Sequence, residues 1–476
     1  MDYLVLQFMA RKKKNIVIEN LTVEAVAAEG KSLARQDGQV IFIERTVPGD
    51  VVDVQVRKKR KAYLEGYPLK FHTYSDLRIE PICEHFGACG GCKWQNLAYD
   101  SQLAFKQQQV EDHLTRIGKI ELPEVSPIIG SAKTDRYRNK LEFTFSNKKW
   151  LTKEQIESDE VIERNALGFH VPRLFDKIVD IDTCHLMADP ANAIKNEIRS
   201  FAIANDYSFF DIREQVGLLR ILMIRYTDAG ELMVLIQFFE NDEEKIGTLM
   251  NHLKSKFPEI TSLLYVINQK KNDTIYDQEI ITFSGKDHIV EKMGDLAFKI
   301  GAKSFYQTNS AQAKILYDKT VEFADLQGDE LVYDLYTGTG TIANYCAKQA
   351  KKVVGIEYVE AAIQDAFVNA EVNGITNTDF YAGDMKDLLN DEFVSEHGQP
   401  DVIITDPPRA GMHENVVNMI MKLAPQKVVY VSCNPATQAR DIALMDQQYQ
   451  VTKVQPVDMF PHTHHVECIC LLELRK

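Results

Sequence analysis

The sequence predicts an α/β fold with a doubly wound, Rossmann-like parallel sheet at its C-terminal end, preceded by an OB-like β-barrel and an α+β region. Short apolar runs carry the first part of this prediction. They alternate with helical stretches and end in acidic or turn residues, which is typical of buried parallel strands. These runs are ELVYDL (330–335), KVVGIE (352–357), DFYAGD (379–384), DVIITD (401–406) and KVVYVS (427–432).

Two further regions precede this domain. Residues 9–72 alternate short β-rich runs with Gly and Pro-Gly-Asp turns, which predicts an OB-like barrel of about five strands. Residues 73–297 mix strand-like runs such as KLEFTFS (140–146) with helical stretches such as 189–206, which predicts a central α+β domain. Residues 298–476 then form the C-terminal domain.

Composition sets limits on the class of protein. The 476 residues are 45% hydrophobic and 26% charged with a net charge of −14, as in soluble globular proteins. No run of 18 apolar residues is present, so no membrane-spanning helix is expected. The apolar opening before Met9 is too short for a signal peptide, which favours a cytoplasmic protein, and Met9 is an alternative start. The basic clusters at 11–14 and 57–61 are either solvated surface or a phosphate-binding patch.

The first strand of the C-terminal domain leads into a glycine-rich turn, DLYTGTGTIANYCA (334–347). The turn is neither a G-x-G-x-x-G nor a Walker motif, but Gly338 and Gly340 allow close approach of a ligand to the backbone. Glu357, 19 residues after Gly338, ends the second strand, where an acid can accept hydrogen bonds from ribose hydroxyls. Asp384 ends the third run and suits an adenine amino group. These features alone fit NAD as well as S-adenosylmethionine.

The fourth strand ends in DPPR (406–409), which decides between the two cofactors. Paired prolines stiffen a loop that can hold a planar group beside a transferable methyl, and this motif is characteristic of methyltransferases that act on nucleic-acid bases. The order of these features therefore favours S-adenosylmethionine.

Cys433 lies where the fifth strand gives way to a helix, with Asn434 as the expected N-cap and Pro435 at the first helical position. The helix dipole there favours a thiolate. Zinc held with the histidines of HTHH (462–465) is the alternative, but that spacing matches no common zinc pattern. A thiolate beside a methyl donor can add to C6 of uracil and make C5 nucleophilic. Glu467 is the expected base for the C5 proton.

Five motifs in chain order resemble the RNA uracil-5-methyltransferase family, and the resemblance covers the whole C-terminal domain. The motifs are SFYQTN (304–309), DLYTGTGT (334–341), DPPR (406–409), SCNP (432–435) and PHTHHVE (461–467). The resemblance implies that Cys433 is the nucleophile and Glu467 the base. It also implies a set of residues that line the methyl-donor site: Gln307, Tyr336, Thr341, Glu357, Asp384 and Asp406. Thr341 stands where relatives often have Asn, and Phe305 suits either base stacking or core packing.

A second cluster of cysteines stands outside that domain. Cys83, Cys89 and Cys92 have the spacing C-x5-C-x2-C, and Cys184 is the expected fourth ligand. Four thiolates suit zinc or a [4Fe–4S] cluster equally well. The ribosomal-RNA branch of the family has this spacing with [4Fe–4S] and an N-terminal TRAM domain, which residues 9–72 resemble.

The resemblance to this branch implies 23S rRNA as the substrate, with a uridine splayed out of its stack, and nothing in the sequence requires more than a monomer. The alternatives are a tRNA uracil-5-methyltransferase, an amino-group methyltransferase that uses only DPPR, and a non-catalytic RNA-binding iron–sulfur protein.

Overall fold

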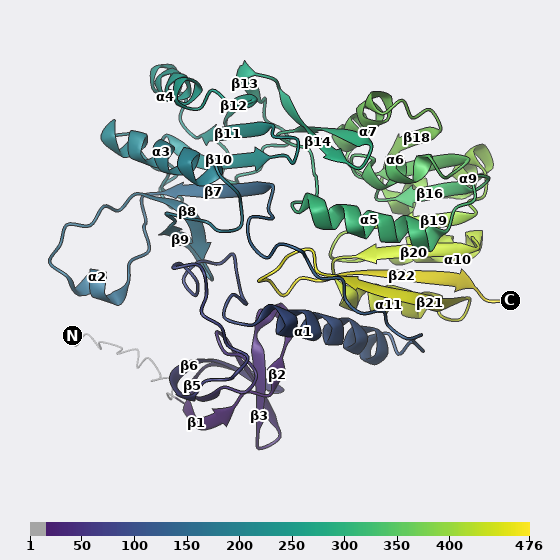
Figure 1. The fold of residues 1–476 in the computed structure, drawn as a ribbon, viewed down its shortest axis with the longest axis horizontal. Coiled ribbons are helices and arrows are strands. Elements are labelled where there is room, and N and C mark those ends of the chain that lie inside the picture. The colour runs from purple at the N-terminus through teal and green to yellow at the C-terminus, as the bar shows by residue number, and fades with distance from the viewer. Residues whose placement is uncertain (1–15) are drawn as a thin grey trace, which may run out of the picture. The chain divides into compact units, whose positions relative to one another are not determined.

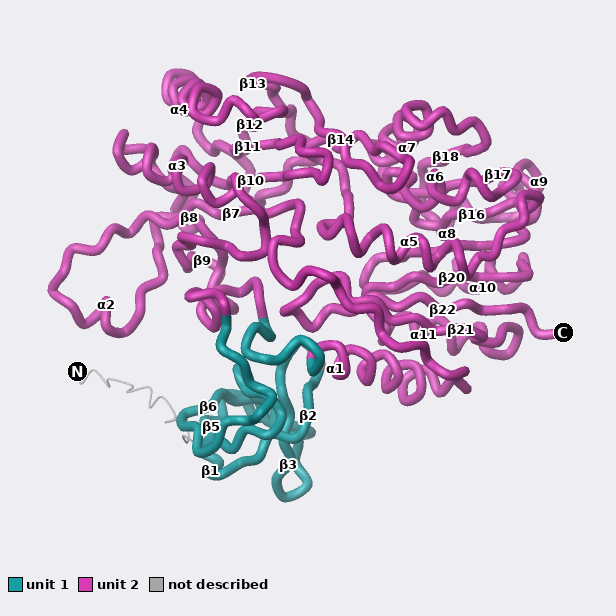
Figure 2. Tube along the Cα trace, viewed as in Figure 1, with its two compact units in different colours: residues 1–81, 93–101 teal, residues 82–92, 102–476 magenta. Residues whose placement is uncertain are grey.

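The computed structural model describes residues 16–476, and these divide into two compact units (Figure 2). The smaller unit comprises the described residues up to Pro81 with Lys93–Ser101, and the larger comprises Ile82–Cys92 with Gln102–Lys476. The basic cluster at 11–14 and Met9 lie outside the described residues. The predicted central and C-terminal domains share the larger unit, so the limits predicted at 72/73 and 297/298 remain predictions.

The smaller unit is the predicted β-barrel, with six strands rather than about five because a two-residue strand is added. In sheet order β1-β5-β6-β4-β3-β2, the strands are Ile16–Thr22, Val51–Lys59, Tyr63–Thr73, Gln39–Ile43, Ser32–Gln36 and Ala25–Val26. Alternate residues such as Val52 and Val54 point into the core of this unit, as the period of a strand requires. The second basic cluster, residues 57–61, is exposed at the end of β5.

A seven-stranded mixed sheet forms the first part of the larger unit (Figure 1). In sheet order, its strands are β13 (Ile281–Gly285), β12 (Ser262–Ile267), β11 (Leu232–Phe238), β10 (Leu219–Tyr226), β7 (Lys140–Ser146), β8 (Ala166–Val171) and β9 (Leu174–Asp180). One face packs on α3 (Ala191–Ala204) and α4 (Glu243–Lys256). The hairpin β14 (His288–Met293) and β15 (Leu296–Gly301) follows, and α2 (Lys153–Glu157) lies in a connection.

The second sheet of this unit confirms the predicted doubly wound domain. Its order is β18-β17-β16-β19-β20-β22-β21, in which the first five are parallel and β22 is antiparallel to β20. The five predicted runs form β16 (Leu331–Leu335), β17 (Lys352–Glu357), β18 (Thr378–Ala382), β19 (Val402–Thr405) and β20 (Lys427–Ser432). The remaining strands are β21 (Tyr449–Val457) and β22 (Glu467–Leu474).

Helices cover both faces of this sheet. One face packs on α5 (Ser310–Ala324), α6 (Thr341–Ala347) and α7 (Glu360–Val372). The other face packs on α8 (Met385–Leu388), α9 (Asp391–His397), α10 (Glu414–Leu423) and α11 (Pro435–Met445). The first of these cores also includes Met223, Leu235 and Val266 of the mixed sheet, so the two sheets share one hydrophobic core. That shared core explains why the two predicted domains form one unit.

Helix α1 (Tyr99–Asp112) is continued by one π-helical turn (His113–Ile117). Val110 and Leu114 are buried as its apolar spacing requires, but Gln102 and Lys106 are buried as well. Within the part of the chain that the structure describes, no helix is both long and apolar enough to cross a membrane.

Candidate active site and methyl-donor site

The turn after β16 has the backbone geometry of a ligand-binding loop. Tyr336, Gly338 and Gly340 have φ angles of 66°, 56° and 74°, and Thr337 donates a hydrogen bond to the buried Asp334 at 2.5 Å. A Cβ at Gly338 would meet no atom within 4 Å, so this backbone borders open space. Such a turn, opening a helix, fits the close approach of a nucleoside-bearing cofactor.

The acidic residues predicted for the donor site lie at the carboxyl ends of the parallel strands, where ligands bind in open α/β sheets. Glu357 ends β17, and its carboxylate accepts hydrogen bonds from the backbone N–H of Gly338 (3.2 Å) and of Val359 (3.0 Å). Asp384 caps α8 and pairs with Lys386 at 2.6 Å, which lowers the pKa of Asp384. The bond to Gly338 holds the Glu357 carboxylate against the glycine-rich turn.

The other predicted donor residues lie on neighbouring segments. Thr341 begins α6, and its hydroxyl lies 3.3 Å from that of Thr339. Tyr336 is partly buried, and burial raises its pKa to about 12. Gln307 lies in the loop before α5, where its carbonyl accepts a hydrogen bond from the side chain of Asn139 at 2.9 Å. Phe305 in the same loop is 68% exposed, so it is free of the core packing that was one of its two predicted roles.

Cys433 lies directly after β20, and the helix start that follows it is built as predicted. Asn434 caps α11 by accepting a hydrogen bond from the N–H of Ala436, and Pro435 occupies the first turn. The amide of Asn434 also donates to the carbonyl of Arg409 at 2.9 Å, and the hydroxyl of Thr437 donates to the same carbonyl at 3.2 Å. These two bonds hold the DPPR loop against the start of α11, directly after Cys433.

Cys433, Asp406 and Glu467 form one electrostatic cluster. Burial, reinforced by the charge of Asp406, raises the pKa of Glu467 to about 8, whereas Arg409 opposes the shift. Burial also raises the pKa of Asp406 to about 7. Burial together with the charges of Glu467 and Asp406 raises the pKa of Cys433 to about 11. These raised pKa values mean that few of the three groups are ionised near neutral pH. Such a cluster is suited to transferring a proton from one group to another.

The pKa of Cys433 corrects one step of the sequence argument. The position at a helix N-terminus predicted a thiolate, but two buried carboxyl groups and loss of solvent outweigh the helix dipole. The free protein therefore holds a thiol, and the proton must be removed for the sulfur to attack. The dipole prediction was wrong chiefly because Cys433 is partly removed from solvent, and because β22 also brings the charge of Glu467 to this site.

The loop that precedes Glu467 is anchored by α1. Lys106 of α1 pairs with Asp458 at 2.6 Å with both side chains fully buried, and Lys106 also donates to the carbonyl of Phe460. The amide oxygen of Gln102 accepts a hydrogen bond from the N–H of His462 at 2.8 Å. His465 is kept neutral at physiological pH because burial lowers its pKa to about 3. No sequence pattern pointed to Lys106 or Asp458, whereas Arg409 could have been found from its place in DPPR.

The four predicted metal-ligand cysteines are neighbours in the larger unit. Burial, with contributions from Cys92, Cys184 and Cys83, raises the pKa of Cys89 to about 12, and Cys184 is raised to about 11 in the same way. The donor chemistry is that of a four-thiolate site. The fit is incomplete, because among residues 16–476 no group of three or more His, Cys, Asp or Glu side chains is arranged to hold a metal ion.

The chain matches two known protein-family models and has relatives of similar length. Residues 218–475 match the model of the tRNA (Uracil-5-)-methyltransferase family, and residues 14–69 match the TRAM domain. An RNA methyltransferase of Bacteroides thetaiotaomicron is 58% identical over 454 residues, covering 94% of this chain and 100% of that protein. One of Porphyromonas gingivalis is 54% identical, covering 95% and 99%.

A solved structure is similar over nearly the whole chain. It is the Pyrococcus abyssi tRNA (uracil-54, C5)-methyltransferase in complex with S-adenosyl-L-homocysteine, which superposes with a TM-score of 0.74 at 28% identity. The match covers 95% of this chain and 100% of that one.

Proposed function

This chain belongs to the tRNA (uracil-5-)-methyltransferase family and is an S-adenosylmethionine-dependent RNA methyltransferase, and from that premise we propose that it methylates C5 of a uridine in 23S rRNA through a covalent Cys433 adduct. The convergence of Cys433, Glu467 and Asp406 in one partly buried cluster supports this proposal most strongly. A methyltransferase acting on amino groups would have no use for a thiol at this position.

The residues of the chain have separate roles in this mechanism. When bound, S-adenosylmethionine supplies an electrophilic methyl group, and the residues proposed to hold it are Gln307, Tyr336, Thr341, Glu357, Asp384 and Asp406. The thiol of Cys433 releases its proton to solvent, and its sulfur adds to C6 of uracil, which converts the ring to an enolate with a nucleophilic C5. After methylation, ionised Glu467 takes the proton from C5, and the S–C6 bond breaks to restore the ring.

The mechanism is tested with RNA that carries tritium at C5 of uridine, because only attack from C5 releases that tritium to water. We expect Cys433→Ala to abolish both tritium release and methylation. Glu467→Gln should form the adduct but not resolve it, leaving a protein–RNA complex that survives denaturing electrophoresis. Glu473→Gln, at the other end of β22, is the matched control and should retain activity. Undiminished methylation by Cys433→Ala would overturn the mechanism.

Two classes of RNA are candidates for the substrate. The TRAM domain and the four cysteines support 23S rRNA through the resemblance to the ribosomal-RNA branch. The full-length similarity to the Pyrococcus abyssi tRNA enzyme supports tRNA as the second candidate. Mapping 5-methyluridine in 23S rRNA and in tRNA from a deletion strain decides between them, because the modification should disappear from only one RNA.

We also propose that Cys83, Cys89, Cys92 and Cys184 hold a [4Fe–4S] cluster with a structural role. The mutual proximity of the four thiols supports this assignment. Protein purified without oxygen should be brown and contain about four iron and four sulfide ions per chain. A colourless protein that contains zinc would contradict it.

We further propose a monomer acting in the cytoplasm, and light scattering behind size-exclusion chromatography tests the oligomeric state.

A further inference from the structure

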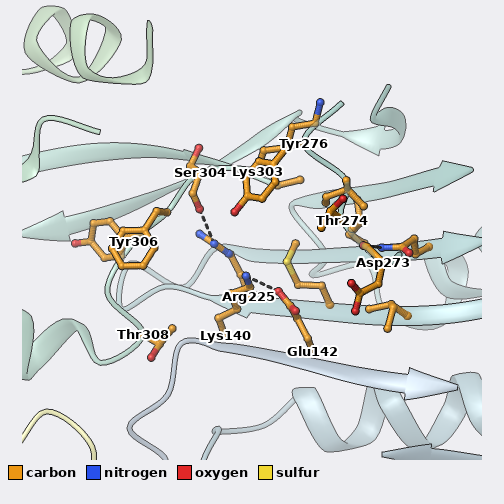
Figure 3. A pocket seen from close by; sticks show the side chains of 17 residues that line it. Lys140, Glu142, Arg225, Asp273, Thr274, Tyr276, Lys303, Ser304, Tyr306 and Thr308 are labelled. Atoms are coloured by element: carbon orange, nitrogen blue, oxygen red, sulfur yellow. Dashed lines mark hydrogen bonds and ion pairs between the residues drawn. The ribbon is translucent and has the colours of Figure 1, made fainter. Parts of the chain in front are cut away.

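A cavity of about 280 Å³ lies on the larger unit, and none of the residues assigned above to methyl-donor binding lines it. Its walls come from β7, β10 and β11 of the mixed sheet and from the loops at 273–276 and 302–308. Figure 3 shows Arg225 in the middle of the lining side chains, between Ser304 and the pair Lys140 and Glu142. The volume is near the lower end for small-ligand pockets, about 300–1,000 Å³.

The central side chain of this cavity is a buried cation. Arg225 is 4% exposed, and one terminal nitrogen donates to the carbonyl of Ser304 at 2.7 Å. Its Nε has no hydrogen-bond partner, and no ion pair to Arg225 is found anywhere in residues 16–476. Burial lowers the pKa of Arg225 to about 10, so the guanidinium remains charged at neutral pH. Glu142 favours the charged form of Arg225 from a distance, but its ion pair is made with Lys140. A buried charge without a counter-ion in direct contact is costly, and an anionic ligand would reduce that cost.

The other charges of the cavity indicate which anion fits. Lys303 donates to the carbonyl of Gln278 at 2.6 Å and, within the described chain, pairs with no carboxylate. Lys140 pairs with Glu142 at 2.5 Å, and Asp273 is the second carboxylate of the wall. Three cations against two carboxylates suit the single charge of a phosphodiester better than a polyphosphate.

An aromatic side chain at the cavity indicates that the anion carries a ring. Tyr276 lines the cavity, is 69% exposed, and lies close enough to Arg225 to influence its pKa. An exposed aromatic ring beside unpaired cations is the arrangement by which proteins bind single-stranded nucleic acid, since bases stack on the ring and phosphates meet the cations.

The cavity is linked to the catalytic cluster through one loop. Ser304 accepts the hydrogen bond of Arg225, and Gln307, proposed to contact the methyl donor, lies three residues later. Tyr306 and Thr308, on either side of Gln307, both line the cavity. The cavity and the proposed methyl-donor site therefore share this loop, which is the geometric reason to assign both to one RNA strand.

We propose that this cavity binds a second nucleotide of the RNA strand that carries the target uridine. Its phosphodiester lies against Arg225 and Lys303, and its base stacks on Tyr276. The inference rests on the proposed function for the identity of the RNA, but not for the binding of single-stranded RNA itself. It assigns a specificity site to the central region, distinct from the barrel and from the reaction centre.

The test is the salt dependence of binding, measured on the full-length protein by anisotropy of a short fluorescent oligouridylate. Each lost phosphate contact reduces the slope of log affinity against log salt by about 0.7. Lys303→Gln and Arg225→Gln should show this reduction. Tyr276→Ala should weaken binding about tenfold at unchanged slope, because stacking involves no counter-ion release. Lys254→Gln, an exposed lysine on α4, is the matched control and should behave as wild type.

Wild-type slopes in both Lys303→Gln and Arg225→Gln would overturn the inference. Because Arg225 also holds the carbonyl of Ser304, Lys303→Gln and Tyr276→Ala keep the test valid if the Arg225 variant folds poorly. A calorimetric signal for uridine 5′-monophosphate that is lost in Lys303→Gln, with an unchanged oligouridylate slope, would assign the cavity to a free nucleotide and also overturn it. Tritium release by the wild type is measured in parallel, so failure of the proposed chemistry is recognised separately from failure of this site.

Discussion

Replacing Lys106 with Met should destabilise the folded protein by about 3–5 kcal/mol, because it leaves the Asp458 carboxylate buried without its counter-ion. The two charged atoms lie 2.6 Å apart and both side chains are fully buried. At an effective dielectric constant of about 20, their attraction is about 6 kcal/mol. Dehydration of the two ions costs several kcal/mol each, and burial accordingly lowers the pKa of Lys106 despite the nearby carboxylate. The intact pair therefore contributes little net free energy to folding, whereas one of the two ions buried alone would be strongly destabilising.

This reasoning predicts how a second substitution acts. Asp458→Asn removes the negative charge but keeps the oxygen that accepts a hydrogen bond from the N–H of Phe460. Combined with Lys106→Met, it should restore about 2 kcal/mol of the lost stability. Lys314→Met breaks the Lys314–Asp318 pair on α5, whose atoms lie 2.7 Å apart with side chains 44% and 45% exposed. That control should cost less than about 0.5 kcal/mol, since exposed pairs contribute little.

Urea unfolding followed by circular dichroism measures the free energies of unfolding, and hydrogen exchange of residues 458–463 reports on the loop itself. Because this loop leads into Glu467, Lys106→Met should lower kcat while the Kd for S-adenosylmethionine stays within about twofold of wild type. Equal destabilisation by Lys106→Met and Lys314→Met would refute the argument from burial. So would a double variant less stable than Lys106→Met alone.

Three further outcomes are expected. Since burial raises the pKa of Glu467 to about 8 and the base must be ionised, kcat should rise with pH through about 8, and a flat profile from pH 7 to 9 would contradict its role. Gly340→Ala should cost about 2–4 kcal/mol in thermal unfolding, because its φ is 74° and the new Cβ would lie 2.8 Å from that of Ala366. Gly374→Ala, with φ 63° and no atom within 4 Å, should cost only about 1 kcal/mol. Glu357→Gln should weaken S-adenosylmethionine binding about tenfold by calorimetry, whereas unchanged affinity would remove Glu357 from the donor site.

The parallel sheet could be predicted from the sequence because burial on both faces forces each strand to be a short, nearly continuous apolar run. The polar residues that α1 buries could not be predicted from the sequence. The apolar residues at helical spacing in this segment are Leu103, Val110 and Leu114, yet Leu103 is only half-buried while Gln102 and Lys106 are fully buried. Their partners lie more than 350 positions later in the chain, and no local pattern reports such a contact.

The catalytic cluster could likewise be predicted from the sequence only in part. Its residue types could be predicted because Asp406 and Cys433 each follow a parallel strand and Glu467 begins the last strand, so that all three meet at one edge of the sheet. The protonation state of Cys433 could not, because it depends on the depth of burial and on two carboxyl groups from other strands. The cavity around Arg225 was not predicted, since its walls come from segments spread over residues 140–308 and the SFYQTN loop is the part of them that a motif had marked.

The crowding of acidic groups around Cys433 has a consequence for methyl-donor binding. S-adenosylmethionine carries a positive sulfonium, and its charge would favour the ionised forms of Asp406 and Glu467, whose pKa values are raised to about 7 and about 8. By linkage, its affinity should rise between pH 6 and pH 9 as these carboxyl groups ionise. S-adenosylhomocysteine has a neutral sulfur and is the matched control, so its affinity should change much less. Calorimetry at several pH values measures both, and parallel pH dependence of the two ligands would show that the sulfonium does not interact with these carboxyl groups.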